Sequence, residues 1–235
     1  MSEAFFETGG LRFWREAEID FREYAIRAIT HAVKGPLETL NRGWTFVRCE
    51  CPSLVATSRL SGAYTGDDVF LLQAKIAGHE FCLRPETTPT SYEVARRLMQ
   101  RGGEYRPPLC VWQAGKSFRR ELSDGATAAK LRFNEFWQVE FQCIYSIGTK
   151  ADYRTAVIPT VKATIAGLTC AQGRVVPSER TPLYSRETLD IEIQRGADDW
   201  CEVASISIRT DFAPDMEVLE VAIGLDRIVA ISFKE

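Results

Sequence analysis

Two arginines, a glutamate and an aromatic ring stand in a regular order in the segment FRRELSDGATAAKLRFNEF, which covers residues 118–136. Arg119 and Glu121 precede a small polar loop, and Arg132 and Phe136 follow it. Guanidinium groups bind phosphate oxygens through paired hydrogen bonds, an aromatic ring stacks on a purine, and a carboxylate accepts from the adenine amine. Most charged strand faces are simply solvated, but this order of residues favours a site for a nucleoside triphosphate.

The neighbouring residues Gly115-Lys116-Ser117 look like the end of a phosphate-binding Walker loop. That loop needs another glycine five residues earlier, where Cys110 stands, and the preceding segment PPLCVWQ is not glycine-rich. We therefore interpret this segment as part of a strand that leads to Arg119.

The polar loop is expected to join two long strands, at 109–121 and 130–145, because Ser123-Asp124-Gly125 is typical of a turn. Side chains alternate across a strand, so the second strand has one apolar face that meets a core and one polar face. The apolar set is Phe133, Trp137, Val139 and Phe141, and the polar set is Arg132, Asn134, Phe136, Gln138 and Glu140.

The rest of the chain mixes helical and strand-like patterns. Residues 14–40 carry apolar residues at helical spacing and predict one or two helices, interrupted near Gly35–Pro36. Together the patterns predict the α+β class: one domain over residues 1–235, with a mostly antiparallel sheet flanked by helices. Further helices are expected at 90–101, at 153–168 and from Asp226 onward, and further strands at 43–52, 68–74, 80–84, 188–194, 200–208 and 217–223.

The composition excludes some classes of protein. The chain is 45% hydrophobic and 26% charged, and its net charge of −3 gives no global basic signature for nucleic acid. No segment has the length of a membrane span and the N-terminus lacks an apolar signal core, so we expect no membrane partner. Seven scattered cysteines predict reduced thiols and a cytoplasmic location. Cys49-x-Cys51 lacks a matching second pair, so zinc is the weaker interpretation of it.

The predicted hairpin resembles motif 2 of the class II aminoacyl-tRNA synthetases, which reads Phe-Arg-x-Glu, a loop, then Arg-x-x-x-Phe. The segment EVAIGLDRIVAI, at 220–231, resembles motif 3, and the helical pattern at 17–40 followed by a strand that ends at Pro52 resembles motif 1. LRPETTPT, at 83–90, and DWCEVASISIRTDF, at 199–212, are similar to segments of the dimeric glycyl-tRNA synthetases. The resemblance covers roughly residues 15–235 and implies the class II fold.

The resemblance implies a role for each matching residue. Arg119 would contact the α-phosphate and the amino-acid carboxylate, and would be catalytic together with Arg227. Phe136 and Arg227 would sandwich the adenine of ATP, Glu121 would accept from the adenine amine, and Arg132 would bind the γ-phosphate. The amino-acid site would contain Glu86, Glu202, Glu220 and Ala222, and Glu202 is alternatively a ligand of Mg²⁺.

Two positions depart from the glycyl-tRNA synthetase pattern. Ala222 stands where those enzymes have a serine, and Ser205 stands where they have a glycine. Glycine is therefore the first expected substrate, with alanine, serine or another small amino acid behind it. The chain ends at Glu235, soon after motif 3, whereas synthetases of this group continue into an anticodon-binding domain.

These features leave three hypotheses. The first is an ATP-dependent ligase that activates a small amino acid and passes it to an acceptor other than a normally selected tRNA, such as a carrier protein or a small metabolite. The second is a minimal tRNA synthetase that reads only the acceptor end of a tRNA, and the third is a non-catalytic accessory subunit. Relics usually lose their ATP ligands and this chain keeps them, so we expect an enzyme. The absence of an anticodon-binding module from the sequence favours the first hypothesis over the second.

A homodimer is also expected, because class II cores generally pair through motif 1. The apolar residues of this region would form the interface, or would alternatively fill the chain's own core. They are Phe21, Ala25 and Ile29 in the helical pattern and Trp44, Phe46 and Val47 in the strand.

Overall fold

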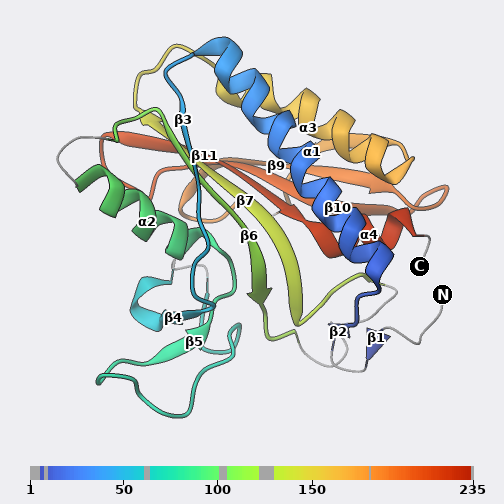
Figure 1. The fold of residues 1–235 in the computed structure, drawn as a ribbon, viewed down its shortest axis with the longest axis horizontal. Coiled ribbons are helices and arrows are strands. Elements are labelled where there is room, and N and C mark those ends of the chain that lie inside the picture. The colour runs from blue at the N-terminus through green and yellow to red at the C-terminus, as the bar shows by residue number, and fades with distance from the viewer. Residues whose placement is uncertain are drawn as a thin grey trace.

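A computed structural model describes residues 6–7, 10–60, 64–100, 105–121, 130–179 and 181–233 of the chain (Figure 1). The turn predicted at 123–125 lies outside these residues, as does Arg101 at the end of the helix predicted at 90–101.

A seven-stranded sheet forms the centre of the described part of the chain. Neighbouring strands pair antiparallel, except for β3 at one edge, which lies parallel to β6. The predicted α+β class is confirmed, with one parallel pair added to the antiparallel sheet. From edge to edge the strands are β3 (Thr45–Arg48), β6 (Leu109–Phe118), β7 (Glu135–Ser146), β11 (Met216–Gly224), β10 (Trp200–Arg209), β9 (Ser185–Gln194) and β8 (Gly173–Pro177).

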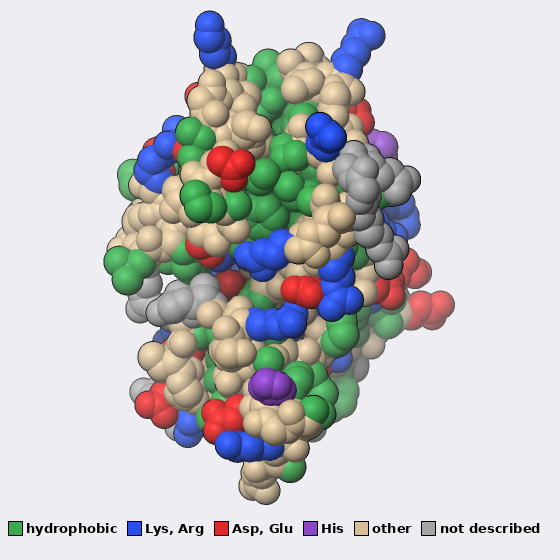
Figure 2. Space-filling view, turned by 90° about the vertical axis from the view of Figure 1, so that its left-hand side faces the viewer, with side chains coloured by type: hydrophobic (Ala, Val, Ile, Leu, Met, Phe, Trp, Pro, Cys, Tyr) green, Lys and Arg blue, Asp and Glu red, His purple; other side chains and the backbone are tan. Residues whose placement is uncertain are grey.

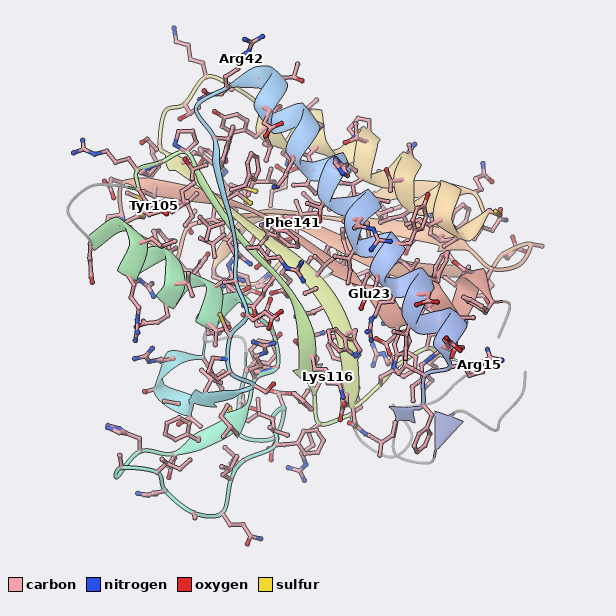
Figure 3. The ribbon with its side chains drawn as sticks, viewed as in Figure 1. Arg15, Glu23, Arg42, Tyr105, Lys116 and Phe141 are labelled. Atoms are coloured by element: carbon pink, nitrogen blue, oxygen red, sulfur yellow. The ribbon has the colours of Figure 1, made fainter. Side chains whose placement is uncertain are left out.

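One face of the sheet is apolar and is covered by helices. Trp112, Phe141 and Val221 are direct partners on three successive strands and form one apolar row. The rings of Trp112 and Phe141 stack with their centroids 5.3 Å apart, and Phe141 lies beneath the N-terminal helix in Figure 3. The covering helices are α1 (Glu16–Leu40), α3 (Tyr153–Thr169) and α4 (Leu225–Ser232), and none of the described helices is long and apolar enough to cross a membrane.

The opposite face of the sheet is polar along much of its length. α2 (Thr88–Gln100) covers one end of this face, where Tyr92 and Ala95 pack against Leu109 and Val111. Beyond that end the face carries a polar row that crosses five strands, and this row is the floor of the candidate site. Its members are Gln113, Glu140, Ala222, Ser205 and Asp190.

Helix α1 runs without a break through Pro36, so the predicted interruption near Gly35–Pro36 is wrong. A proline inside a helix offers no N–H to the carbonyl four residues earlier, which here belongs to Ala32. Thr160 of α3 donates its hydroxyl to that carbonyl oxygen at 2.8 Å. The lost helical hydrogen bond is therefore replaced by a bond from the neighbouring helix.

Residues 68–74 do not form the predicted strand. The Asp68 carboxylate accepts from the amide and the hydroxyl of Thr65, both at 2.7 Å, and so stabilises a turn where the strand should begin. Leu71 makes only an isolated bridge, to Cys82. The remaining elements are β1 (Phe6–Glu7), β2 (Leu11–Arg12), β4 (Leu54–Ala56), the 3-10 helix η2 (Thr57–Arg59) and β5 (Phe81–Leu83), of which the sequence predicts only β5.

Candidate active site

Arg119 and Phe136 lie together where β6 ends and β7 begins. Ser117 is the direct partner of Phe136, so Arg119 follows the last paired residues of β6. The guanidinium carbon of Arg119 lies 5.3 Å from the centre of the Phe136 ring and 5.9 Å from that of Tyr64. Its Nε donates to the carbonyl oxygen of Pro85 at 3.2 Å. The guanidinium is thus held between two rings and the backbone that precedes Glu86.

Glu121 and Arg132 lie at the mouth of the same strand pair. The amide of Glu121 donates to Asn134 Oδ1 at 2.7 Å, and Arg132 Nη1 lies 3.5 Å from Glu121 Oε2. Arg132 is exposed, and an exposed ion pair contributes little free energy. Both charged groups are therefore free to change partners.

Arg227 of α4 and Glu202 of β10 are brought together by an irregularity in the sheet. A β-bulge between Glu202 and Ala204 places Glu202 opposite Glu192 and hence on the polar face. Arg227 Nη1 donates to the carbonyl oxygen of Glu202 at 2.5 Å and lies 3.9 Å from its carboxylate. Strict alternation would have put Glu202 on the apolar face, so the bulge is what delivers this carboxylate to the site.

Three glutamates, Glu86, Glu140 and Glu220, are buried on the polar side of the sheet. Arg209 lies among them, with its Nη1 2.8 Å from Glu220 Oε2 and 3.7 Å from Glu86 Oε1. Burial, with contributions from Glu220 and Glu86, raises the pKa of Glu140 to about 8. Burial also raises the pKa of Glu86, and the charge of Arg119 opposes the rise in both groups. Such a buried concentration of carboxylates favours a cationic ligand.

The residues that follow Glu86 fix two of these carboxylates. Thr87 donates both its amide, at 3.0 Å, and its hydroxyl to Glu140. Thr88 donates its hydroxyl to Glu220 at 2.7 Å. A single short segment at the start of α2 therefore sets the positions of carboxylates on β7 and β11.

Glu86 itself stands at the wall of a cavity of about 530 Å³. Its Oε2 accepts from the Tyr64 hydroxyl at 3.1 Å, whereas its Oε1 is buried without a hydrogen-bond partner. Arg209 and Tyr184 also line the cavity. A buried acceptor without a donor is costly, so Glu86 Oε1 is suited to receive an N–H or O–H from a ligand.

Ala222 lies half-buried in the polar row, directly between Glu140 of β7 and Ser205 of β10. The two positions that depart from the glycyl-tRNA synthetase pattern are therefore neighbours across the sheet. Direct cross-strand neighbours have Cβ atoms about 5 Å apart. The row lacks a hydroxyl at Ala222 and carries one on the adjacent strand, at Ser205.

Comparison with known proteins begins with curated sequences. No family model matches the chain. A glycine–tRNA ligase of Cutibacterium acnes is 30% identical over 136 residues, which are 55% of this chain and 28% of that ligase. A glycine–tRNA ligase of Bifidobacterium longum is also 30% identical over 136 residues, 55% of this chain and 27% of that ligase. The chain spans less than a third of the length of these relatives.

Solved structures match nearly the whole chain. The prolyl-tRNA synthetase of Giardia lamblia, in complex with prolyl-adenylate, has a TM-score of 0.73 and 14% identity, over 98% of this chain and 49% of that one. The pyrrolysyl-tRNA synthetase of Desulfitobacterium hafniense has a TM-score of 0.63 and 19% identity, over 94% of this chain and 71% of that one. The chain has a class II aminoacyl-tRNA synthetase-like core. At these identities the structural likeness establishes the fold alone.

Arg84 ties together the segments behind the site of this synthetase-like core. It is 2% exposed, its Nε donates to the Lys116 carbonyl oxygen at 2.9 Å, and its Nη1 donates to the Cys51 carbonyl oxygen at 3.1 Å. A Cβ at Gly115 would lie 2.4 Å from Arg84 Nη2, so a larger residue at this position of β6 would force the buried guanidinium to move. Arg84 therefore fixes the start of the segment that carries Glu86.

Three residues of the site received no role in the sequence-based prediction. Alternation does place Glu140 on the same face as Phe136, and Arg209 does match the 199–212 segment, so a signal was present for both. Tyr64 gave no signal, because it lies outside the regular elements and reaches Glu86 and Arg119 only through the fold.

The described side chains of the candidate site are compatible with Mg²⁺ held together with substrate phosphates, but they do not form a complete metal site by themselves. Among the residues with assigned positions, no group of three Cys, His, Asp or Glu side chains is arranged to hold a metal. Protein Mg²⁺ sites commonly use one or two carboxylates together with substrate phosphates and water. Glu202, whose side chain is 52% exposed beside Arg227, fits that pattern. Within the described part of the chain, no further Cys, His, Asp or Glu side chain completes a zinc site with Cys49 and Cys51.

Proposed function

We propose that the chain binds ATP and a small amino acid, with glycine as the first candidate, and joins them as an aminoacyl adenylate. The observation that carries this proposal is the convergence of two sets of residues on one face of the sheet. One set, around Arg119, has the chemistry of a nucleotide site. The other, around Glu86, has the chemistry of an ammonium site. An enzyme that activates amino acids needs a nucleotide site and an ammonium site on opposite sides of the same α-phosphate.

The nucleotide would lie over the ends of β6 and β7. Phe136 and Arg227 would hold the adenine between an aromatic ring and a guanidinium plane. Glu121 would accept from the adenine amine, and Arg132 would exchange its weak pairing with Glu121 for the γ-phosphate. Arg119, which is held by Pro85 and flanked by Phe136, would reach the α-phosphate.

The amino acid would lie deeper, with its ammonium group among Glu86, Glu140 and Glu220. Glu86 Oε1 supports this placement, because it is a buried acceptor without a donor. Ala222 and Ser205 would face the small side chain. Neither adds much volume, which supports glycine or another small amino acid as the substrate.

Activation would form one bond and break one bond at the α-phosphorus. An oxygen of the amino-acid carboxylate attacks, the bond to the β-phosphate oxygen breaks, and pyrophosphate leaves. Arg119 would stabilise the charge that develops on the α-phosphate oxygens, and positioning of the two substrates would supply much of the remaining acceleration. When bound, Mg²⁺ would neutralise charge on the pyrophosphate, with Glu202 as its protein ligand.

Amino-acid-dependent exchange between ATP and pyrophosphate tests the proposal. Each of the twenty amino acids is assayed separately, with and without Mg²⁺. We expect exchange that requires Mg²⁺ and one small amino acid. An absence of exchange with every amino acid would contradict the proposal and favour a non-catalytic accessory subunit.

We further propose that the acyl group passes to a carrier protein or a small molecule in preference to a selected tRNA. The net charge of −3 supports this preference, because phosphate contacts supply much of the affinity of proteins for nucleic acids. Labelled amino acid and ATP are incubated with the chain and either total tRNA or a thiol-bearing carrier protein. Label that accumulates only on tRNA would replace this proposal with the minimal synthetase.

A further inference from the structure

We propose that Cys49 and Cys51 form a thiol modification site, at which a small disulfide oxidises the pair to an intramolecular disulfide bond. The two sulfur atoms lie 3.7 Å apart, just after β3. Both side chains are partly exposed, and Glu50 between them is exposed. A small oxidant can therefore reach the pair from solvent.

The local geometry suits a bond within the pair. Side chains two residues apart on an extended chain project to the same side, and the amide of Cys49 remains bonded to the Trp112 carbonyl oxygen at 2.9 Å. The sulfur atoms must approach from 3.7 Å to the ~2 Å of a disulfide bond.

Cys51 is the nucleophile of the pair. The hydrogen bond with Cys49 is the main cause that lowers the pKa of Cys51 to about 6. Thr90 and Arg84 also lower this pKa, whereas partial burial opposes the change. The Cys51 thiolate attacks one sulfur of the small disulfide and releases one thiolate, which leaves a mixed disulfide. Cys49 then loses its proton to solvent, attacks the Cys51 sulfur and releases the second thiolate. Two cysteine thiols are oxidised and the small disulfide is reduced to two thiols.

Each of the other cysteines lacks either a second sulfur close to its own or exposure to solvent. The sulfur atoms of Cys110 and Cys143 lie 3.4 Å apart, but both residues are completely buried between β6 and β7. Cys170 is exposed, but its thiol contacts the Gly167 carbonyl oxygen and not another sulfur of the described residues. Cys82 and Cys201 are buried. Cys49 and Cys51 combine proximity with access.

The pair is connected to the candidate active site through Arg84. The carbonyl oxygens of Cys51 and Pro52 accept from Arg84 Nη1 at 3.1 and 3.2 Å. Formation of the disulfide would rotate the backbone that presents these carbonyls. We expect oxidation to shift Arg84 and with it Glu86, two residues further along the chain. The expected effect of this shift on activity rests on the proposed function, whereas the modification itself does not.

Peptide mapping tests the modification directly. Trypsin cleavage after Arg48 and Arg59 gives a peptide, residues 49–59, that contains both cysteines and no other. The reduced native protein is treated with oxidised glutathione, then denatured and alkylated. We expect the 49–59 peptide to lose two hydrogen atoms and take up no alkyl group, while Cys110 and Cys143 are alkylated. Two alkyl groups on this peptide, under conditions that modify Cys170, would overturn the proposal.

Single variants test the order of attack. Cys49→Ser should stop at a mixed disulfide between Cys51 and glutathione, whereas Cys51→Ser should leave Cys49 largely unmodified. Equal modification of the two variants would overturn the assignment of Cys51 as nucleophile. Cys170→Ser is the matched control and should form the 49–51 bond at the wild-type rate. The wild-type map decides the main question even where a variant fails to fold.

The coupling to the site is measured by exchange between ATP and pyrophosphate in the reduced and oxidised proteins. Displacement of a positioning element by about 1 Å can cost up to a hundredfold in rate, so we expect a loss of at least about tenfold that dithiothreitol reverses. Full activity in the oxidised protein would overturn the coupling through Arg84. An absence of exchange in the reduced protein would count against the proposed function and leave the peptide map unaffected.

Discussion

Arg119 is the residue on which both halves of the proposed site depend. Its guanidinium lies 5.3 Å from the Phe136 ring, and its charge opposes the pKa rise of Glu86 and Glu140. Arg119→Ala removes a cation from the place where charge develops in the transition state, which costs about 3–4 kcal/mol, or two to three decades in rate. We expect a loss of that size in exchange between ATP and pyrophosphate, with little change in the free energy of unfolding.

Arg120→Ala is the matched control for that experiment. Arg120 is adjacent in sequence, but its side chain is 50% exposed and lies 3.7 Å from Asp67. This variant should keep exchange close to the wild-type rate. Equal losses in the two variants, or full activity in Arg119→Ala, would mean that the assignment of motif 2 is wrong.

Buried carboxyl groups should give the stability of the protein a particular pH dependence. Burial is the main cause that raises the pKa of Glu140 to about 8 and that of Asp226 to about 7, whereas both groups titrate near about 4 in an unfolded chain. Between these values the folded state holds protons that the unfolded state releases. The contribution of these two groups to the free energy of unfolding is therefore largest below about pH 4, and it falls as the pH rises towards 7–8.

Urea unfolding at about pH 5 and about pH 8.5 measures that fall. Glu140→Gln and Asp226→Asn should each reduce the difference between the two pH values, because neither amide ionises. Asp226→Asn also keeps an acceptor for the Trp137 amide, which donates to Asp226 Oδ2 at 2.5 Å. A wild-type difference that both variants retain in full would contradict the assignment of these groups.

At the scale of elements, the sequence predicts what local pattern controls. Period-two alternation assigns the polar and apolar faces of β7, and the register confirms that Glu220 and Ala222 share a face of β11. The predicted break in α1 fails because of a contact between distant segments: Thr160 of α3 bonds to the carbonyl oxygen that Pro36 leaves unpaired. Glu202, which the family resemblance assigns to the site, reaches the polar face through a bulge that alternation does not predict.

Gly115 provides a test of how β6 and Arg84 fit together. In Gly115→Ala the new Cβ would lie 2.4 Å from Arg84 Nη2, so the buried guanidinium must move. Overpacking of this kind costs about 1–3 kcal/mol, and we expect both a lower free energy of unfolding in urea and reduced exchange activity. Gly167→Ala is the control, since nothing lies within 4 Å of its Cβ on α3. That change should be neutral or stabilising by about 0.5–1 kcal/mol. The same effect at both positions would contradict the role of Gly115.

At the scale of the whole molecule, three of the six apolar residues expected to form a dimer interface lie in the chain's own core, whereas Phe21, Phe46 and Val47 are half-buried. Ala25 and Ile29 are completely buried and Trp44 is 7% exposed. The dimer prediction therefore depends on half-buried residues at the outer edge of β3, including Val47, and beside it. Figure 2 shows hydrophobic side chains gathered on the face where Tyr105 lies in Figure 3. Half-buried hydrophobic residues of this region are Val47, Val94, Leu98, Met99, Tyr105, Ala213 and Met216.

The outward edge of β3 is where a second copy would pair. Thr45 and Cys49 donate their amides to the Pro108 and Trp112 carbonyl oxygens at 3.1 and 2.9 Å, so the amide of Arg48 points away from β6. Arg48→Pro removes that outward donor and leaves the ladder with β6 intact. We expect sedimentation to show a wild-type dimer at micromolar concentration, weakened by Arg48→Pro more than by Arg48→Ala. A monomeric wild type would contradict the prediction.

The cations near the site offer little surface to the body of a tRNA. Arg96 packs over the rings of Tyr92 and Phe212, 5.6 and 5.1 Å from their centroids, and Arg97 pairs with Glu93 at 2.8 Å. On the face shown in Figure 2, Lys and Arg side chains are interspersed with Asp and Glu. The cations of this helix are thus engaged by side chains of the chain itself.

We therefore expect the chain to bind tRNA weakly and in a salt-sensitive manner, with little difference between tRNA species. Arg119 and Arg132 remain available to an acceptor end, which corresponds to roughly two or three phosphate contacts, against the six to ten that give a steep salt dependence. Filter binding of several purified tRNAs at two salt concentrations measures both quantities, and Arg132→Ala should reduce the salt slope by about one contact. Tight, species-selective binding that persists at physiological salt would contradict this expectation and favour a minimal synthetase that reads the acceptor stem.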